Sequence, residues 1–324
     1  MPVPNFQYKK PEKKAIRDAF GKAMLELGEK HEDVVVLTDD LCSSTRLDAF
    51  KDSFPDRFFQ VGVAEQNLVG IATGLAMTGK IPFAASFASF CPGRCLDQIR
   101  MQICLNKLKV VIVGSHAGLS HPKDGVSVQA TEDIAIMRSM PHMVVVVPAD
   151  YNQTIAAVQA IYACKQAVYI RIAREPTAVF SKKSIFKIGQ AQLLKTGGNL
   201  TLISAGPLLA EVLQAAQKAE SFGISCEVIN LSTIKPIDSK TIIRSAKKTK
   251  AILTIEDHQQ QGGLGSAVAE VIVKNYPVKM QIMGLNNEFG RTSKDYQSLI
   301  KYYHLDSDSI LSEIKKIKAV KKYS

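Results

Sequence analysis

The chain has 324 residues, of which 46% are hydrophobic and 22% charged, an ordinary balance for a folded protein with a substantial core. Its length exceeds one average domain, so we expect two. The start of the sequence lacks the apolar segment of a signal peptide, and no apolar run reaches the length of a membrane span. We therefore expect a cytoplasmic protein with no membrane partner.

The net charge is +11, from 41 basic and 30 acidic residues, which raises the question of nucleic-acid binding. Much of the excess lies in two terminal runs, Lys9 to Arg17 and Lys315 to Lys322. Aromatic residues do not interleave with these lysines and no recognised nucleic-acid module is present, so we expect no nucleic-acid partner. A basic field would suit anionic sugar phosphates equally well.

Residues 12–30 carry large apolar side chains at helical spacing, which predicts an amphipathic helix. The apolar run Val34–Leu37 follows and predicts a buried parallel strand. Its carboxyl end leads into the polar loop 38–45, and open α/β sheets bind ligands at such strand ends. Ser44 in this loop is a candidate phosphate contact, although a serine or aspartate there would equally cap the next helix.

Glu65 is a lone carboxylate that opens an apolar helix of small residues ending at Ala76. A glutamate in the first turn is favourable against the helix dipole, by about 0.3 to 1 kcal/mol. An unpaired carboxylate in apolar surroundings is nevertheless costly and takes up a proton. The site must therefore provide hydrogen bonds to Glu65 or use its proton, and the small residues behind it allow close approach of another backbone.

Three phenylalanines, at positions 83, 87 and 90, follow among residues with little bulk. Aromatic faces beside small side chains can form a stacking surface for a flat ring. Ordinary core packing explains the same pattern, and the residues themselves do not decide between the two.

Further buried strands are predicted at Lys109–Val113, Met143–Val147 and Ala167–Arg171, each separated by a segment of helix length. This alternation indicates a doubly wound parallel sheet. The polar segment after Phe180 has little periodicity and marks the expected domain boundary.

A second α/β unit begins near Leu200. Its expected elements are strands at 200–206, 226–230 and 251–256, and helices at 208–222 and after Gly263. The predicted fold is thus two consecutive α/β domains with mainly parallel sheets, spanning residues 1–182 and 190–324.

The six cysteines show neither Cys-x-x-Cys spacing nor the density of a disulfide scaffold, and we expect them to be reduced. No histidine lies at metal-ligand spacing from them. We expect no metal to be held by this chain.

Four segments together carry a family pattern: Phe59 to Ala76, Phe87 to Arg100, Lys-Pro-Ile-Asp at 235–238 and Gly-Gly-Leu-Gly-Ser-Ala-Val at 262–268. They resemble the C-terminal half of transketolases, which use thiamine diphosphate, and the resemblance covers nearly the whole chain. It implies a pyrimidine-binding domain followed by a transketolase C-terminal domain.

The resemblance also implies roles for three residues. Glu65 would hydrogen-bond a ring nitrogen of the cofactor's aminopyrimidine and favour the imino tautomer that deprotonates the thiazolium carbon. Phe87 and Phe90 would pack around the pyrimidine ring. The net reaction implied is transfer of a two-carbon ketol unit from a ketose phosphate to an aldose acceptor.

Transketolases hold the diphosphate through Mg²⁺ with a Gly-Asp-Gly motif, which this sequence lacks. The only comparable element, Lys123-Asp-Gly125, lies inside the pyrimidine-side domain. We therefore expect a split enzyme in which a separate N-terminal subunit holds Mg²⁺ and the diphosphate. Family resemblance implies a homodimer of such heterodimers.

The implied substrate residues are less complete. Family members carry Gly-Glu-Asp-Gly followed by Ser or Thr and often His; here Asp124 and Ser127 match, while Lys123 and Val128 depart. His121 and Lys123 are otherwise expected in an exposed loop. The sequence therefore leaves the identities of the sugars open.

Two further residues follow strands where substrate groups are expected. His116 is a candidate for the site or a hydrogen-bonded core histidine. Arg174 falls where the family places a phosphate-binding arginine, and a guanidinium grips phosphate with two parallel hydrogen bonds. A surface ion pair is the alternative for Arg174.

Three other functions compete with the transketolase interpretation. The β subunit of a 2-oxoacid dehydrogenase also uses a Glu-Gln pair on thiamine diphosphate, but the aromatic segment and Leu96–Arg100 favour transketolase. A deoxyxylulose phosphate synthase normally carries both halves on one chain. A non-catalytic partner would keep Glu65 without a working substrate site.

Overall fold

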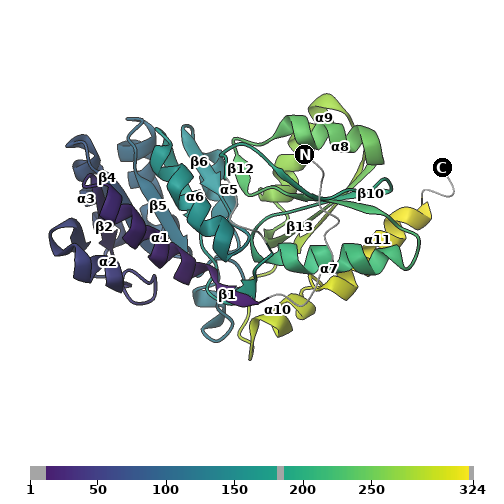
Figure 1. The fold of residues 1–324 in the computed structure, drawn as a ribbon, viewed down its shortest axis with the longest axis horizontal. Coiled ribbons are helices and arrows are strands. Elements are labelled where there is room, and N and C mark those ends of the chain that lie inside the picture. Colours follow the sequence, from purple (N-terminus) through teal and green to yellow (C-terminus); the bar gives the residue numbers. More distant parts are fainter. Residues whose placement is uncertain (1–11, 181–185, 321–324) are drawn as a thin grey trace.

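The computed structural model describes residues 12–180 and 186–320 (Figure 1). The basic runs at the two ends and the polar segment after Phe180 therefore lie partly outside the described residues. Two sheets with helices on both faces form the two halves of the molecule, the earlier half of the chain on the left of Figure 1 and the later half on the right. The predicted fold class is confirmed.

The first sheet has seven strands in the order β12-β6-β7-β5-β4-β2-β3, and all neighbours are parallel except β12 and β6. The central strands are rich in β-branched residues and buried on both faces, as parallel sheets require. Their bounds are β2 (Val34–Thr38), β3 (Phe58–Gln60), β4 (Ile81–Phe87), β5 (Val111–Ser115), β6 (Met143–Val146), β7 (Ala167–Arg171) and β12 (Thr233–Lys235).

Helices cover both faces of this sheet. On one face α1 (Ile16–Lys30) and α6 (Tyr151–Ala163) lie side by side (Figure 1), with α2 (Asp48–Ser53) beside α1. The other face carries α3 (Glu65–Met77), a helical segment made of α4 (Leu96–Gln98) and a π-helical stretch (Ile99–Cys104), and α5 (Asp133–Ser139). The helix expected from residue 12 begins at Ile16, because β1 (Lys13–Ala15) pairs antiparallel with β8 (Pro176–Ala178).

The second sheet has the order β14-β13-β10-β11-β9, with only β9 antiparallel to its neighbour. The strands are β9 (Gln192–Lys195), β10 (Leu200–Ser204), β11 (Cys226–Asn230), β13 (Ala251–Gln259) and β14 (Lys279–Leu285). Helices α7 (Leu209–Glu220), α10 (Tyr296–Tyr302) and α11 (Ser307–Val320) pack on one face, and α8 (Ser239–Thr249) and α9 (Leu264–Asn275) on the other.

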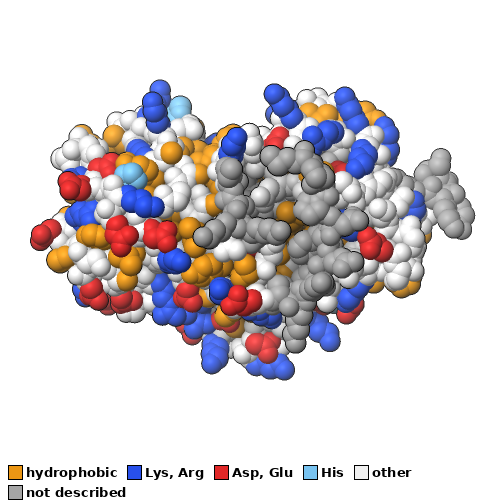
Figure 2. Space-filling view, in the orientation of Figure 1, with side chains coloured by type: hydrophobic (Ala, Val, Ile, Leu, Met, Phe, Trp, Pro, Cys, Tyr) orange, Lys and Arg blue, Asp and Glu red, His pale blue; other side chains and the backbone are white. Residues whose placement is uncertain are grey.

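None of the described helices is long and apolar enough to cross a membrane. All six cysteines are free thiols, four of them buried. On the face shown in Figure 2, lysines and arginines gather at the outer edge of the second half, where α8 carries four basic residues.

The two halves of the chain are joined by shared structure. Strand β12 belongs to the later half of the sequence but pairs with β6 at the edge of the first sheet. The apolar cluster on the α3 face continues without a break into residues of α8 and α9. The halves therefore share a hydrophobic core as well as a sheet.

Arg171, at the end of β7, ties the halves together by charge and is only 3% exposed. Its Nε lies 2.9 Å from Asp133 Oδ2, and its Nη1 lies 2.6 Å from Asp257 Oδ1 on β13. Burial alone would lower the pKa of Arg171, but the two carboxylates raise it above its usual range. The guanidinium thus stays charged in the core because acids from both halves compensate it.

Removing one acid of this network should destabilise the fold strongly. We expect Asp257→Ala to lower the free energy of unfolding by about 3 to 5 kcal/mol, because it leaves Arg171 incompletely compensated in the core. Glu270→Ala is the matched control: Glu270 also pairs across the halves, with Arg138 at 2.8 Å, but is 58% exposed, and its loss should cost below about 1 kcal/mol. Urea unfolding measures both, and equal losses would contradict the compensation argument.

Candidate active site

Glu65 is the first residue of α3, and its side chain is largely buried at 7% exposure. The loop before it turns at Gly62, which has a left-handed φ of 73°, so that the helix starts beside the carboxyl end of β2. Arg94 Nη1 donates to Glu65 Oε1 at 2.8 Å. The compensation that the sequence demanded for this carboxylate is therefore a guanidinium, whose own side chain is 55% exposed.

Two aromatic rings lie beside this ion pair. Phe87 ends β4 and Phe90 follows one turn later, with ring centroids 6.0 Å apart and nearly parallel planes. The guanidinium carbon of Arg94 lies 4.4 Å from the centroid of the Phe90 ring. The carboxylate of Glu65 and the face of Phe90 thus together accommodate a flat group that donates N–H.

Asp39 is a second buried acid near Glu65, at the carboxyl end of β2. Ser86 Oγ donates to its Oδ2 at 2.6 Å, while its Oδ1 has no hydrogen-bond partner among the described residues. Burial raises the pKa of Asp39 to about 6 despite the bond from Ser86, and the charge of Glu65 adds to the rise. The site therefore holds two acids in different environments.

Arginines gather beside the loop that carries Ser44. Arg17, on α1, donates from Nη1 to the Ser44 carbonyl at 3.3 Å, and its buried Nε has no partner among the described residues. Burial lowers the pKa of Arg17, and the neighbouring positive charges of Arg46 and Arg174 lower it further. Arg46 pairs with Asp18 and Arg174 with Glu175, whereas Arg17 has no carboxylate partner among the described residues, so the cluster carries excess positive charge and suits an anion.

His116 links the aromatic rings to this basic cluster. Its ring lies 4.0 Å from that of Phe87, and its Nδ1 is 2.9 Å from Ser115 Oγ. Burial, and then the charges of His121 and the arginines, lower the pKa of His116 to about 2. The imidazole is therefore neutral at physiological pH and can donate or accept one hydrogen bond.

We expected His121 in an exposed loop, but it is buried. Its ring centroid lies 5.1 Å from that of His116 and 6.2 Å from that of Phe87. Lys123 is exposed, as expected. Asp124 is 57% exposed and its Oδ2 lies 3.4 Å from His121 Nδ1. The loop thus brings an imidazole beside the rings even though Val128 replaces the histidine common in the family.

The loop 121–129 is held by a segment of the second half of the chain. Ser293 N donates to the Pro122 carbonyl at 2.8 Å, and Gln129 Nε2 donates to the Arg291 carbonyl at 3.1 Å. At Gly125, with a left-handed φ of 72°, a Cβ would lie 2.2 Å from Thr292 Oγ1. The segment Arg291–Ser293 of the second half therefore positions the candidate substrate loop.

Sequence reasoning missed Arg17, Asp39, Arg94 and His121 as members of this site. Arg17 occupies a polar position of an amphipathic helix and looks like an ordinary surface charge. Arg94 lies in a single 3-10 turn, Gly93–Cys95, whose place beside α3 only the fold determines. The polar loop at the end of the first strand did signal Asp39, but not its burial.

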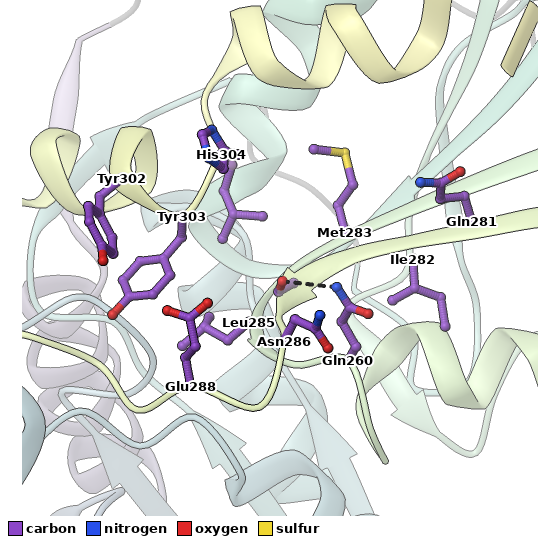
Figure 3. A pocket seen from close by; sticks show the side chains of 12 residues that line it. Gln260, Gln281, Ile282, Met283, Leu285, Asn286, Glu288, Tyr302, Tyr303 and His304 are labelled. Carbon is purple, nitrogen blue, oxygen red and sulfur yellow. Dashed lines mark hydrogen bonds between the residues drawn. The ribbon is translucent and has the colours of Figure 1, made fainter. Parts of the chain in front are cut away.

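The cavities found in the described residues lie away from this candidate site. One of about 460 Å³ borders β14 and is lined by Gln260, Met283, Glu288 and Tyr303 among others (Figure 3). Within the described parts of the chain, no group of three or more metal-ligating side chains is found. That a separate N-terminal subunit holds Mg²⁺ stays a prediction.

Comparison with known proteins gives the family. A family model named "Transketolase, pyrimidine binding domain" matches residues 12–178, and one named "Transketolase, C-terminal domain" matches residues 189–310. The chain belongs to the transketolase family, whose members depend on thiamine diphosphate.

Two relatives and one solved structure illustrate the similarity. A putative transketolase C-terminal section of Methanocaldococcus jannaschii is 44% identical, over 93% of this chain and 95% of its own length. The 6-deoxy-6-sulfo-D-fructose transketolase subunit SqwH of a Clostridium species is 39% identical, over 85% and 86%. A structure described as a split gene transketolase, inactive beta4 tetramer, is 42% identical with a TM-score of 0.86, over 93% and 97%.

The buried Asp39 should make stability fall as pH rises. Its pKa in the folded chain, about 6, exceeds its ordinary value of 3.8, so the folded state binds more protons between these values and raising the pH favours unfolding. We expect Asp39→Asn to remove this dependence. Relative to the variant, the wild type should lose stability from pH 4 to 7, by at most about 1.4 kcal/mol per pH unit.

Urea unfolding at several pH values measures this difference. Asp40→Asn, at the neighbouring exposed position, is the matched control for replacing an aspartate by asparagine in this loop. Parallel profiles for wild type and Asp39→Asn would contradict the burial of this acid.

Proposed function

We propose that this chain is the pyrimidine-side subunit of a split, thiamine diphosphate-dependent transketolase. It transfers a two-carbon ketol unit from a ketose phosphate to an aldose acceptor, together with an N-terminal subunit that holds Mg²⁺ and the diphosphate. The observation that carries this proposal is the buried Glu65, which pairs with the Arg94 guanidinium, a flat N–H donor that lies over the Phe90 ring.

Three residues of this chain would hold the pyrimidine end of the cofactor. Glu65 would hydrogen-bond a ring nitrogen, and Phe87 and Phe90 would pack around the ring. When bound, thiamine diphosphate supplies a nucleophilic carbon that attacks the ketose carbonyl and allows the adjacent carbon–carbon bond to break. The buried Glu65 side chain, protonated or sharing its proton with that nitrogen, would assist the proton transfer that this activation requires.

The basic cluster supports an anionic sugar as substrate. Arg17 donates to the Ser44 carbonyl, the charges of Arg17 and Arg174 act on His116, and the buried Nε of Arg17 has no partner among the described residues. In the proposed enzyme these groups bind the phosphate, while His116, His121 and Asp124 contact substrate hydroxyls. A sulfonate would fit the same charges, and the relative from Clostridium is named for a sulfo-sugar.

Exposed apolar side chains at and near α3 favour a protein partner. Val63 precedes α3 and Met77 ends it, each 73% exposed, and Leu105 after the neighbouring π-helical stretch is 65% exposed. Exposed apolar side chains that gather in one patch mark interaction surfaces, and in the proposed enzyme these three belong to such a patch. An N-terminal subunit bound here would complete the cofactor site, in a homodimer of heterodimers.

The competing functions make different demands on this site. A 2-oxoacid dehydrogenase subunit would act on a 2-oxo acid without a sugar phosphate, and a deoxyxylulose phosphate synthase would need pyruvate. A non-catalytic partner would bind thiamine diphosphate in the complex without ketol transfer. Incubating the reconstituted complex with each substrate class separates these functions.

Glu65→Ala should abolish most turnover while leaving the fold intact. Loss of assisted proton transfer typically lowers a rate by a factor of about 10² to 10⁴, and we expect a loss in that range for ketol transfer by the complex. Steady-state kinetics measure it, with circular dichroism to check the fold. Glu29→Ala, at an exposed position of α1, is the control; an active Glu65→Ala enzyme would refute the assignment.

Arg17→Met and Arg174→Met should weaken phosphate binding selectively. Each removes a charged hydrogen bond of about 1.5 to 3 kcal/mol, so we expect KM for a phosphorylated ketose to rise about tenfold or more. An unphosphorylated ketose should be affected little. If both substrates lose equally, these arginines act through the fold rather than on phosphate.

A further inference from the structure

Arg94 has a fixed backbone and a side chain that reaches back to the site. Its backbone N–H donates to the Phe90 carbonyl at 2.8 Å, and Gln66 Nε2 donates to the Arg94 carbonyl at 3.1 Å. The first two residues of α3 therefore hold both ends of this arginine: Gln66 binds its backbone, and Glu65 binds its guanidinium.

The guanidinium makes the two contacts expected of the cofactor ring. It is planar and donates N–H to Glu65 Oε1 at 2.8 Å, while its carbon lies 4.4 Å from the centroid of Phe90. Arginine stacks on aromatic faces and pairs with carboxylates as few other side chains can. A ring bonded to the same carboxylate oxygen and stacked on the same face would overlap it.

Arg94 can leave this position without a change of fold. Its side chain is 55% exposed whereas Glu65 is 7% exposed, so the open side of the guanidinium faces solvent and the long stem allows it to swing out. The backbone bonds to Phe90 and Gln66 are independent of that movement. Glu65, by contrast, would be left as a buried acid without a partner until a new donor arrived.

We propose that the Arg94 guanidinium occupies the pyrimidine position and pairs with Glu65 in the free subunit, and that the cofactor ring displaces it on binding. This inference rests on the proposed function of Glu65. Arg94 then competes with the ring, and the apparent affinity for the ring is lowered by the fraction of chains in which Arg94 holds Glu65. Arg94 is thus a positioning residue that keeps Glu65 paired, beside Phe90, until the ring binds.

The test is binding of thiamine, and of 4-amino-5-hydroxymethyl-2-methylpyrimidine, to the full chain without its partner. Ligand-observed NMR titration measures dissociation constants into the millimolar range. We expect Arg94→Met, which keeps the stem and removes the guanidinium, to tighten binding of both probes about tenfold. Arg100→Met, an exposed arginine on the neighbouring helical segment, should leave binding unchanged.

Two other results would overturn the inference. Weaker binding to Arg94→Met would make Arg94 a ligand of the ring, and unchanged binding would show that it does not compete. Glu65→Ala separates this failure from that of the proposed function. Binding that depends on Glu65 but not on Arg94 contradicts only the occupant role, whereas binding that Glu65→Ala leaves intact contradicts the cofactor assignment itself.

Discussion

The energetic cost of removing a carboxylate from water constrains this molecule more than any other interaction. Glu65 lies at the start of a helix built from small residues, where few neighbours could solvate it. Its compensation by Arg94 brings a charged, planar group against Phe90. The chemistry proposed for the protein exploits the same cost, because an acid that needs a donor is ready to bind a nitrogen heterocycle.

The same constraint organises the core between the two halves, with a different outcome. Arg171 is enclosed by Asp133 and Asp257 and is almost fully buried, so that no ligand could take its place. Arg94 is half exposed and has one acid. Burial of the cation therefore distinguishes a permanent structural charge from one that can be exchanged.

Much of the fold could be predicted from the sequence because buried parallel strands appear in it as continuous β-branched, apolar runs. The β-branched runs at 34–37, 143–147 and 167–171 each became a central strand. By contrast, β4 was missed among small and aromatic residues, and β12 is three residues long and pairs far along the chain. Of the candidate site, sequence named the acid and its rings, while the pairing of Glu65 with Arg94 and the contact of His116 with Phe87 join distant segments and leave no local pattern.

Strand β12 also limits how this chain could have been assembled from separate genes. A fragment that stopped before residue 233 would leave β6 as an open edge of the first sheet, with unsatisfied backbone groups and a tendency to aggregate. A break is tolerable only where neither product loses a strand. The first half of the chain therefore depends on residues of the second half to cover the β6 edge of its sheet.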